Sequence, residues 1–449
     1  MGNGASRRIK RAAVLIAAVA AASALTACAG DGPTLPKLTD LNPFKEKQQP
    51  LPGRRVAIVE TTESIANNLA DADKPIVLPA VRANDSWAQP GGEANNAPGH
   101  LALAGTVRQA WTANAGEGSS KAGRIMAPPI VYDGKIYTLD AAGTVTAFSL
   151  SGGKVFQVST VPENENAAGG HGGGLAAEGG RLYIANGYGV AAALDPQTGK
   201  VLWQKNLGAP VRAAPTASGD KLFVVTVQGR FFCLNGNDGT EVWVARGLSQ
   251  QASLLTSTSP AVDGDIVVVP YPSGELVGMK VVDGSPVWSE NLARTRQTSQ
   301  LASMSDAARP AIDGGTVFAI GHAGRIVATQ SKTGERIWTA NVPGTQTPWV
   351  AGDTIYVVDT RGQVMALART DGKTRWTTQL PDSKTWSGPV LAGGSLWLVS
   401  NKGQLVSVDA ATGRLGSQQN LGEAVYITPI VAQGRMFVLT DAAKLIALN

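Results

Sequence analysis

The chain has 449 residues, including 53 glycines, 10 tryptophans and only 2 cysteines. Regularly spaced glycine and tryptophan without helical patterning predict many short strands joined by tight turns. The formal net charge is +5, but four of the basic residues lie in residues 7–11, within a segment that we expect to be removed. The remaining charge of about +1 is too small for a nucleic-acid footprint, so nucleic acid is excluded as a partner.

The N-terminus is typical of an export signal. Residues 7–11 (RRIKR) are basic, and residues 12–27 are apolar and uncharged. This apolar run is short for a transmembrane helix, which needs about 20 residues. The pattern predicts a signal peptide over residues 1–27. The pair Arg7-Arg8 also fits a twin-arginine signal, but the rest of that motif is poor, so the general secretion route is favoured.

The signal ends in small residues followed by Cys28 (LTACAG), which resembles a bacterial lipobox. The resemblance implies that Cys28 is acylated and becomes the lipid anchor of the mature chain. Ala29 replaces the Asp that retains many lipoproteins at the inner membrane, which favours the periplasmic face of the outer membrane. A plain signal peptide with an incidental cysteine is the alternative. Cys233 then has no disulfide partner, and we expect a buried, unreactive thiol.

The region after the signal divides into three parts. Residues 28–53 are rich in proline, lysine and polar residues, which predicts a flexible tether. Residues 54–86 form an N-terminal extension, with a strand pattern at 54–60 and a helix pattern at 62–70. The sequence does not place this extension on the body of the protein, which we assign to residues 87–449.

From about residue 125 one sequence motif recurs. It opens with proline, continues through apolar strand patterns separated by glycine turns, and closes with tryptophan. The clearest copies are 215–243, 260–288, 310–338 and 348–376, and weaker or partial copies are 129–156, 174–203, 389–416 and 429–449. Each copy reads as four strands, and we expect the closing tryptophan to pack between neighbouring sheets. A four-stranded repeat of this length is typical of a propeller blade.

The two ends of the body complete one blade. The last copy, residues 429–449, lacks its tryptophan strand, and residues 107–111 (VRQAW) supply a spare one. Pairing these ends would close the ring and remove open sheet edges. The sequence therefore predicts an all-β fold, an eight-bladed β-propeller of four-stranded blades, with seven blades as the alternative count.

The repeated motif, which ends Asp/Thr-Gly-x-x-x-Trp, resembles the repeat of pyrroloquinoline-quinone-type propellers. Residues 87–92 (WAQPGG) fit the same group. This group includes quinoprotein dehydrogenases and the BamB lipoproteins of the outer-membrane β-barrel assembly (BAM) complex. The lipobox, tether and eight blades together resemble the BamB family. The resemblance implies a scaffold without cofactor or catalysis. Its partners would be the POTRA domains of BamA, other BAM subunits and unfolded outer-membrane proteins.

Two alternative functions remain open. A quinone-dependent dehydrogenase needs a dry cavity, a calcium ion held by carboxylate and amide oxygens, and a catalytic base. Such enzymes commonly add a vicinal disulfide or a CxxCH haem site, and this sequence has neither. A structural or sensory envelope propeller is the second alternative. The histidines His100, His171 and His322 show no metal-ligand spacing, and we expect them in loops or on the surface.

The resemblance to BamB also implies partner contact through inter-blade loops. The two longest connections in the middle of the chain are residues 244–259 and 289–309. Leu254 and Leu255 match the apolar stretch of the family's first partner loop, and Asp306 matches the acidic stretch of the second with a shift of about one residue. The predicted partner-binding residues are Leu254, Leu255, Arg294, Arg296, Asp306 and Arg309. The arginines would contact carboxylates, whereas the alternative for the leucines is packing against their own blade.

Overall fold

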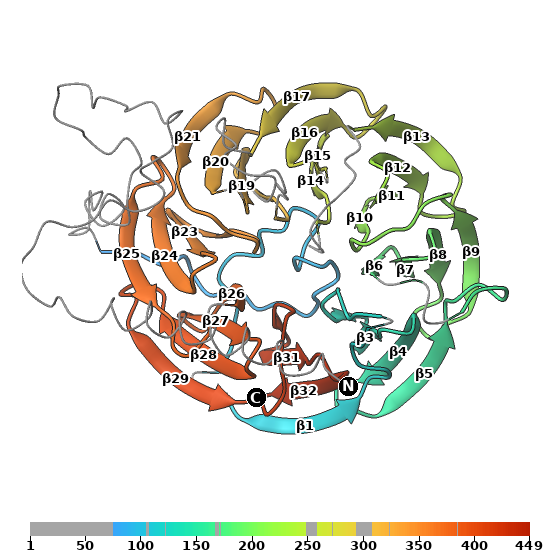
Figure 1. Ribbon diagram of the computed structural model, residues 1–449, viewed down its shortest axis with the longest axis horizontal. Coiled ribbons are helices and arrows are strands. Elements are labelled where there is room, and N and C mark those ends of the chain that lie inside the picture. The colour runs from blue at the N-terminus through green and yellow to red at the C-terminus, as the bar shows by residue number, and fades with distance from the viewer. Residues whose placement is uncertain are drawn as a thin grey trace, which may run out of the picture. The chain divides into compact units, whose positions relative to one another are not determined.

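The computed structural model describes residues 75–449, except for residues 105–106, 122, 167–169, 171, 248–257, 272, 293–307, 323 and 384. In this part of the chain there are 32 strands and no helix, so no membrane-spanning helix is found there. The strands form eight four-stranded antiparallel sheets that stand around a ring as blades (Figure 1). The predicted eight-bladed propeller is confirmed, and the alternative of seven blades is wrong.

The first four blades follow one another along the chain. Blade one consists of β2 (Ile130–Tyr132), β3 (Lys135–Leu139), β4 (Thr144–Ser149) and β5 (Lys154–Ser159). Blade two consists of β6 (Gly173–Glu178), β7 (Arg181–Asn186), β8 (Val190–Leu194) and β9 (Val201–Asn206). Blade three consists of β10 (Thr216–Ser218), β11 (Lys221–Val225), β12 (Arg230–Asn235) and β13 (Glu241–Arg246). Blade four consists of β14 (Ala261–Asp263), β15 (Ile266–Pro270), β16 (Glu275–Lys280) and β17 (Pro286–Asn291).

The remaining blades continue in the same order. Blade five consists of β18 (Ala311–Asp313), β19 (Thr316–Gly321), β20 (Arg325–Gln330) and β21 (Arg336–Ala340). Blade six consists of β22 (Trp349–Ala351), β23 (Thr354–Val358), β24 (Gln363–Ala368) and β25 (Thr374–Gln379). Blade seven consists of β26 (Trp386–Ala392), β27 (Ser395–Ser400), β28 (Gln404–Asp409) and β29 (Leu415–Asn420). Blade eight consists of β30 (Ile430–Ala432), β31 (Arg435–Leu439), β32 (Lys444–Leu448) and β1 (Gln109–Asn114).

Burial within a blade explains its sequence pattern. The two middle strands lie between neighbouring blades, so runs such as residues 222–225 of β11 are buried throughout and apolar throughout. The outermost strands face solvent and alternate, and β9 buries only Trp203 fully while Val201 and Leu202 are exposed. The core is therefore divided into clusters between adjacent sheets.

The ring closes through blade eight as the sequence predicted. Strand β1 pairs antiparallel with β32, with Trp111 opposite Ala447. Just beyond the strands, the backbones of Arg108 and Asn449 exchange two hydrogen bonds of 2.8 Å. Blade eight thus takes its outermost strand from the start of the body and three strands from its end, and the ring has no open seam.

Tryptophans of the outermost strands lie on the next blade, which confirms their predicted packing. In blade two, the Nε1 of Trp203 donates a 2.9 Å hydrogen bond to the carbonyl of Gly236 in blade three. The same indole donation reaches the next blade in five other pairs: Trp111 to Leu150, Trp243 to Val281, Trp288 to Ser331, Trp338 to Arg369 and Trp376 to Ala410. In blade one, Phe156 occupies the corresponding place and packs against Gly199. The tryptophan period of the sequence therefore corresponds to the seams between blades.

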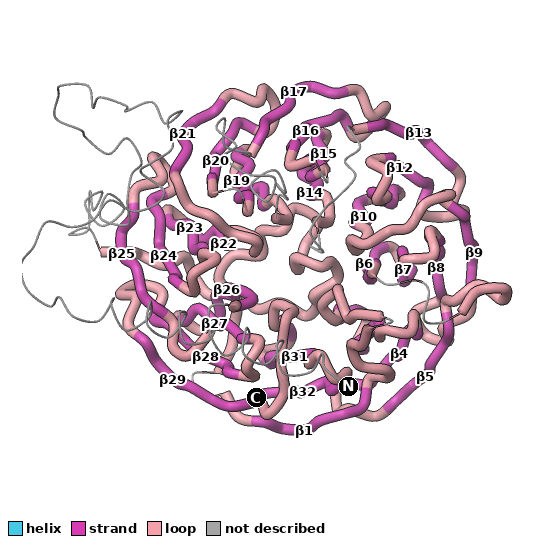
Figure 2. Tube along the Cα trace, viewed as in Figure 1, coloured by secondary structure: helices cyan, strands magenta, loops and turns pink. Residues whose placement is uncertain are grey.

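A segment that precedes the repeats runs round the inside of the ring, and we call residues 84–101 the belt. Figure 1 shows it as the blue trace within the ring, and Figure 2 shows it as a loop. Its hydrogen-bonded contacts, in chain order, are Asn84 with Gln433, Trp87 with Val131, Ala88 with Ala177, Gln89 with Ala217, Ala94 with Val262, Asn95 with Ile312, Gly99 with Trp349 and Leu101 with Leu391. These partners belong to blades eight, one, two, three, four, five, six and seven. The belt thus pairs polar groups along the inner edges of the sheets, which would otherwise lack partners.

Trp87 contacts two blades that are not neighbours in the ring. Its backbone exchanges two hydrogen bonds with Val131 of blade one. Its ring stacks on Trp349 of blade six at a centroid distance of 6.2 Å. Trp87 is only 1% exposed, so these contacts bury it almost completely.

Candidate functional site

The strands that precede the predicted partner loops finish at the same end of the ring. Each blade is a four-stranded meander, so the connections between blades and the turns between second and third strands lie at the same end. Residues 244–259 and 289–309 were predicted as two of these connections, but β13 continues to Arg246 and β17 to Asn291, so the first three residues of each range belong to a strand. Five of the predicted partner-binding residues lie outside the described residues: Leu254, Leu255, Arg294, Arg296 and Asp306. The lipidation residue Cys28 lies outside them as well, and all these roles stay predictions.

Arg309 is the predicted partner-binding residue that the structure describes, and it lies inside the mouth of the channel. Its side chain is buried, and Nη1 donates a 3.0 Å hydrogen bond to the carbonyl of Pro90 in the belt. The belt residue Asn96 also donates through Nδ2 to the carbonyl of Pro310, at 2.8 Å. Burial lowers the pKa of the Arg309 guanidinium to about 10, which leaves it positively charged at neutral pH. The belt therefore fixes a buried cation just before β18.

Arg309 borders a cavity of about 400 Å³, which we call the cup. The cup is lined by Ile125, Met126, Pro128, Arg309, His322, Thr345, Gln346, Thr347, Thr385, Ser387, Tyr426, Ile427 and Thr428. Most of these residues precede the innermost strands of blades one, five, six, seven and eight, whereas the belt contacts lie mainly within or just after those strands. The cup and the belt thus occupy successive levels of the channel.

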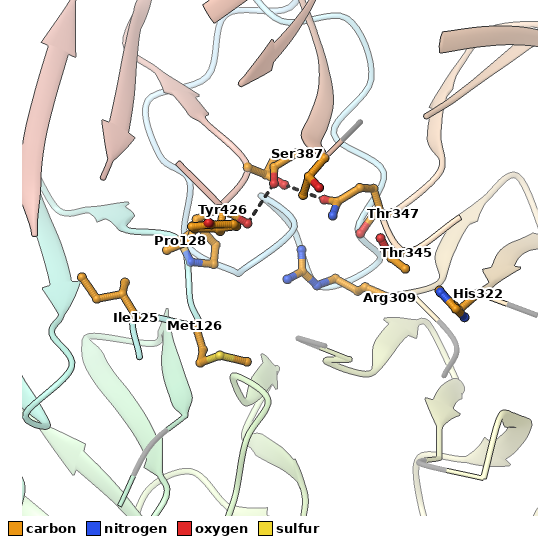
Figure 3. Close-up of a pocket in the computed structure, with 13 residues that line it drawn as sticks. Ile125, Met126, Pro128, Arg309, His322, Thr345, Thr347, Ser387 and Tyr426 are labelled. Carbon is orange, nitrogen blue, oxygen red and sulfur yellow. Dashed lines mark hydrogen bonds between the residues drawn. The ribbon is translucent and has the colours of Figure 1, made fainter. Parts of the chain in front are cut away.

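The cup has an apolar side and a polar side. Figure 3 shows Ile125, Met126, Pro128 and the ring of Tyr426 on one side, and the Arg309 guanidinium extending into the cavity from the other. The polar side continues with Thr345 and Thr347, which Figure 3 shows on the same side as Arg309, and Gln346 between them in the chain also lines the cavity. The phenol of Tyr426 lies at the mouth, where this residue is 45% exposed.

Two hydrogen bonds link the connections that form the polar wall. The Oγ of Ser387 donates to the carbonyl of Tyr426 at 2.8 Å, which joins blade seven to the connection before blade eight. The Oγ1 of Thr428 donates to the Oε1 of Gln346 at 3.5 Å, which joins blades eight and six. The wall of the cup is therefore held by contacts between blades that are distant in sequence.

The described lining residues do not fit a quinone and calcium site. Calcium in proteins takes six to eight oxygen ligands, usually with several carboxylates, and none of the described lining residues of the cup carries a carboxylate. Across the described part of the chain, no group of three or more His, Cys, Asp or Glu residues could hold a metal ion. The chemistry that the cup offers is hydrogen-bond donation around one buried cation.

The histidines occupy different environments. His100 lies in a loop, as predicted, and its side chain is buried there. Its Nε2 accepts a 2.9 Å hydrogen bond from the amide of Gly394, so Nδ1 donates to the carbonyl of Pro79 at 2.8 Å. His100 therefore fixes the end of the belt on blade seven. His322 is exposed as predicted and lines the cup, and His171 lies outside the described residues.

Most cup residues were not predicted from the sequence. They lie in short connections, directly before the prolines that open the repeat copies, as Thr347 does before Pro348 and Thr428 before Pro429. The sequence directed attention to the two longest connections, because long loops on a rigid scaffold often carry function. The signal that could have found the cup is the position before each opening proline, since the ring brings these positions together.

A family model described as "Outer membrane protein assembly factor BamB" matches residues 141–378 and 372–449, well over half of the chain. The chain belongs to the BamB family. A BamB protein of Nitrosomonas eutropha is 22% identical over 167 residues, which cover 37% of this chain and 39% of that protein. An uncharacterised protein of Rickettsia prowazekii, RP232, is 26% identical over 169 residues, 37% of this chain and 40% of that protein. The matches thus span about two fifths of these relatives.

Solved structures show how widely the ring is shared. The crystal structure of BamB from Moraxella catarrhalis matches with a TM-score of 0.65 at 19% identity, over 77% of this chain and all of that chain. A europium-containing methanol dehydrogenase gives the same TM-score at 15% identity, over 79% of this chain and 89% of that chain. At these identities the likeness concerns the fold alone, so the propeller does not by itself separate the BamB family from the dehydrogenases.

Proposed function

We propose that this chain is a non-enzymatic scaffold of the outer-membrane β-barrel assembly complex, which binds BamA and assists the folding and insertion of outer-membrane proteins. The observation that carries the proposal is the match of the BamB family model over residues 141–378 and 372–449. The eight-bladed ring, with connections from every blade at one end, supports a role as a binding platform. A rigid ring can present loops to a partner at little ordering cost.

The proposed contact lies on the inter-blade connections 244–259 and 289–309. An apolar pair such as Leu254-Leu255 can act as a central anchor, with Arg294 and Arg296 contacting carboxylates at its edge. Lipid attached to Cys28 would hold the protein at the periplasmic face of the outer membrane. The remaining subunits of the complex and unfolded barrel proteins are its further proposed partners.

The proposal is tested by isolating the tagged full-length protein from its native envelope in mild detergent and identifying its partners by mass spectrometry. We expect BamA to co-purify, and a Leu254→Asp/Leu255→Asp variant to lose it. A matched control is Val201→Asp/Leu202→Asp, which changes an exposed adjacent apolar pair on the outermost strand of blade two. Absence of BamA from the wild-type isolate would overturn the proposal, and equal loss in both variants would overturn the assigned loop.

The anchor is tested separately by Cys28→Ser in the same strain. We expect the variant to lose its acyl chains and to leave the outer-membrane fraction, because the described part of the chain contains no membrane-spanning helix. Retention of the variant in that fraction would contradict anchoring through Cys28.

A quinone-dependent dehydrogenase is the alternative that a specific observation favours, namely the TM-score of 0.65 to the methanol dehydrogenase. The cup does not supply the carboxylate ligands of such a site among its described lining residues. Purified protein incubated with pyrroloquinoline quinone and calcium, or europium, should show no dye-linked alcohol oxidation. Activity above the buffer control would favour the enzyme. A structural or sensory envelope propeller would instead be indicated by peptidoglycan binding without BamA.

A further inference from the structure

An acidic side chain lies in the seam between blades four and five, near the end of β17 (Figure 1). Glu290 is 8% exposed, although it belongs to an outermost strand. It lies opposite the second residue of the third strand, Leu276. The structure describes all eight outermost strands, and Glu290 is the only carboxylate among them at this position. The other blades carry Ala113, Val158, Lys205, Ala245, Ala340, Thr378 and Gln419 there.

Two arginines of blade five bind this carboxylate. Arg336 donates to Glu290 through Nη2 at 2.6 Å and through Nε at 3.1 Å, and so contacts both carboxylate oxygens. The Nη2 of Arg325 lies 3.8 Å from Oε1 of Glu290 and also donates to the carbonyl of Asn291. The last two residues of β17 are therefore held by side chains of blade five.

The two ends of the connection between blades four and five meet at the end of β19. Leu292, which follows β17, is buried, and a Cβ atom built on Gly321 would lie 3.0 Å from its own Cβ. At the other end, the amide of Ala308 donates to the carbonyl of Ile320 at 2.8 Å. Ile320 and Gly321 are consecutive, so the chain leaves blade four and enters blade five at neighbouring points. Residues 293–307 lie between these two points in the sequence.

The ion cluster is better explained by positioning than by stability. A buried ion pair adds little net stability compared with apolar side chains of similar volume, because both charges lose their hydration. Blades three and five carry Ala245 and Ala340 at the same position, so a seam closes there without a charge. What the cluster adds is a defined geometry, because a guanidinium that contacts both carboxylate oxygens fixes their orientation.

We propose that Glu290 is a positioning residue for the binding of BamA. With Arg325 and Arg336 it fixes the point at which residues 293–307 leave blade four, which lowers the ordering cost when this connection binds its partner. The carboxylate is buried and bound within the chain, so it acts through the connection and not through a contact of its own. The inference rests on the proposed function, which assigns part of the BamA contact to this connection.

The experiment measures the Kd of purified BamA for the full-length protein in detergent by biolayer interferometry. Glu290→Gln keeps the size of the side chain and removes its charge, and the arginines that it leaves are 22% and 44% exposed, so they stay hydrated. Arg325→Gln/Arg336→Gln removes both cations and leaves Glu290 in place. Each variant should weaken BamA binding about threefold or more. The three substitutions together should weaken it no further, because all of them act on one cluster.

Lys205→Gln is the matched control. Lys205 occupies the same position in blade two and lies 3.8 Å from Glu241 of blade three, so this variant also removes an ion pair between neighbouring blades. The connection that follows it, residues 207–215, has no assigned partner. Its affinity for BamA should therefore equal that of the wild type. Binding is compared under conditions in which circular dichroism shows every variant folded, so that a change of stability alone does not alter the Kd. If Glu290→Gln fails to fold, the double arginine variant decides.

Hydrogen exchange tests the positioning without BamA. The amide of Leu292 donates to the carbonyl of Gly274 at 3.2 Å, and the amide of Leu207, which follows β9, donates to the carbonyl of Gly189 at 2.7 Å. In Glu290→Gln the Leu292 amide should exchange faster while the Leu207 amide is unchanged. Equal exchange of Leu292 in the variant and the wild type would overturn the inference.

The binding results separate failure of the inference from failure of the proposed function. If the wild-type protein does not bind BamA, the proposed function fails and the inference fails with it. If the wild type binds and Glu290→Gln binds equally well, the inference alone fails. Loss of binding in Glu290→Gln but not in Arg325→Gln/Arg336→Gln would mean that Glu290 contacts BamA directly, and equal loss in Lys205→Gln would mean a general effect of ion pairs between blades. Either result would overturn the positioning role.

Discussion

The indole ring of Trp203 in blade two lies directly against Gly239 in blade three. A Cβ atom built on Gly239 would lie 2.5 Å from Cε3 of this ring, and the φ angle of Gly239 is +74°. The glycine is therefore required twice, for the left-handed backbone of the turn and for the space that the indole fills. The tryptophan of the repeated motif in one blade therefore packs against the glycine of the same motif in the next blade.

Replacement of Gly239 by alanine should destabilise the propeller strongly. The added methyl group would clash with Trp203 and would also sit at a φ of +74°, so we expect a loss of about 2–5 kcal/mol. Gly219→Ala in the same blade is the matched control, since its φ is +64° but nothing lies within 4 Å of the added atom. That control should lose only about 1–2 kcal/mol. Denaturant midpoints measure both, and equal losses would contradict a role for the seam contact.

Gln89 should be a major contributor to belt docking. Its side-chain amide accepts from the backbone N–H of Ala217 at 3.1 Å and donates to the carbonyl of Ala217 at 3.0 Å, as a neighbouring strand would. Gln89→Leu leaves these buried groups without partners, which should cost about 2–4 kcal/mol. Gln418→Leu, on the exposed outermost strand of blade seven, should change stability by less than about 0.5 kcal/mol. Hydrogen exchange of the Ala217 amide should also accelerate in Gln89→Leu alone, and unchanged exchange would contradict the pairing.

The closing blade should lose stability in acid through Glu423. A hydrogen bond from Lys444 is the main cause that holds the pKa of the Glu423 carboxyl below its ordinary value of 4.5. Because the folded pKa is the lower one, the pair stabilises the folded state above about pH 4.5 and loses this contribution as the pH falls. Both side chains are partly exposed, so we expect less than about 1 kcal/mol at neutral pH.

Lys444→Met tests this pH dependence through denaturant midpoints measured between about pH 3 and 7. The deficit of the variant should be largest at neutral pH and should shrink in acid. Lys154→Met is the control, because Lys154 donates to the amide of Gln157, which does not titrate. A deficit that stayed constant with pH would contradict the Glu423 assignment.

Cys233 should react with thiol reagents only after unfolding. The thiol is fully buried in β12, and burial raises its pKa to about 12. Very little thiolate therefore exists near pH 8, and reagents do not reach it. Alkylation by iodoacetamide should be at least about a hundredfold slower in the native protein than in denaturant. Similar rates in both conditions would mean that the inner strands of blade three open readily.

The sequence determined the architecture of the body because each blade has its own recognisable sequence pattern within one continuous segment. Turn glycines with positive φ, apolar middle strands and the tryptophan of the outermost strand are requirements that every blade meets within about 40–50 residues. The spare strand at residues 107–111 predicted the closure, which the pairing of Trp111 with Ala447 confirmed. The buried environment of Cys233 also followed from its apolar strand. The repeated motif indicated the superfamily, and the lipobox, the tether and the eight blades together indicated the BamB family, which the family model confirmed.

The tertiary structure alone decided what lies inside the ring. The belt has no repeat or hydrophobic period, because it passes from blade to blade and is held on them by backbone and amide hydrogen bonds. Arg309 and Tyr426 are 117 positions apart and line one cavity only because closure brings blades five and eight to the same channel. Local sequence patterns reflect the turns and the packing of each blade. The belt and the cup depend instead on contacts among blades that are distant in the sequence.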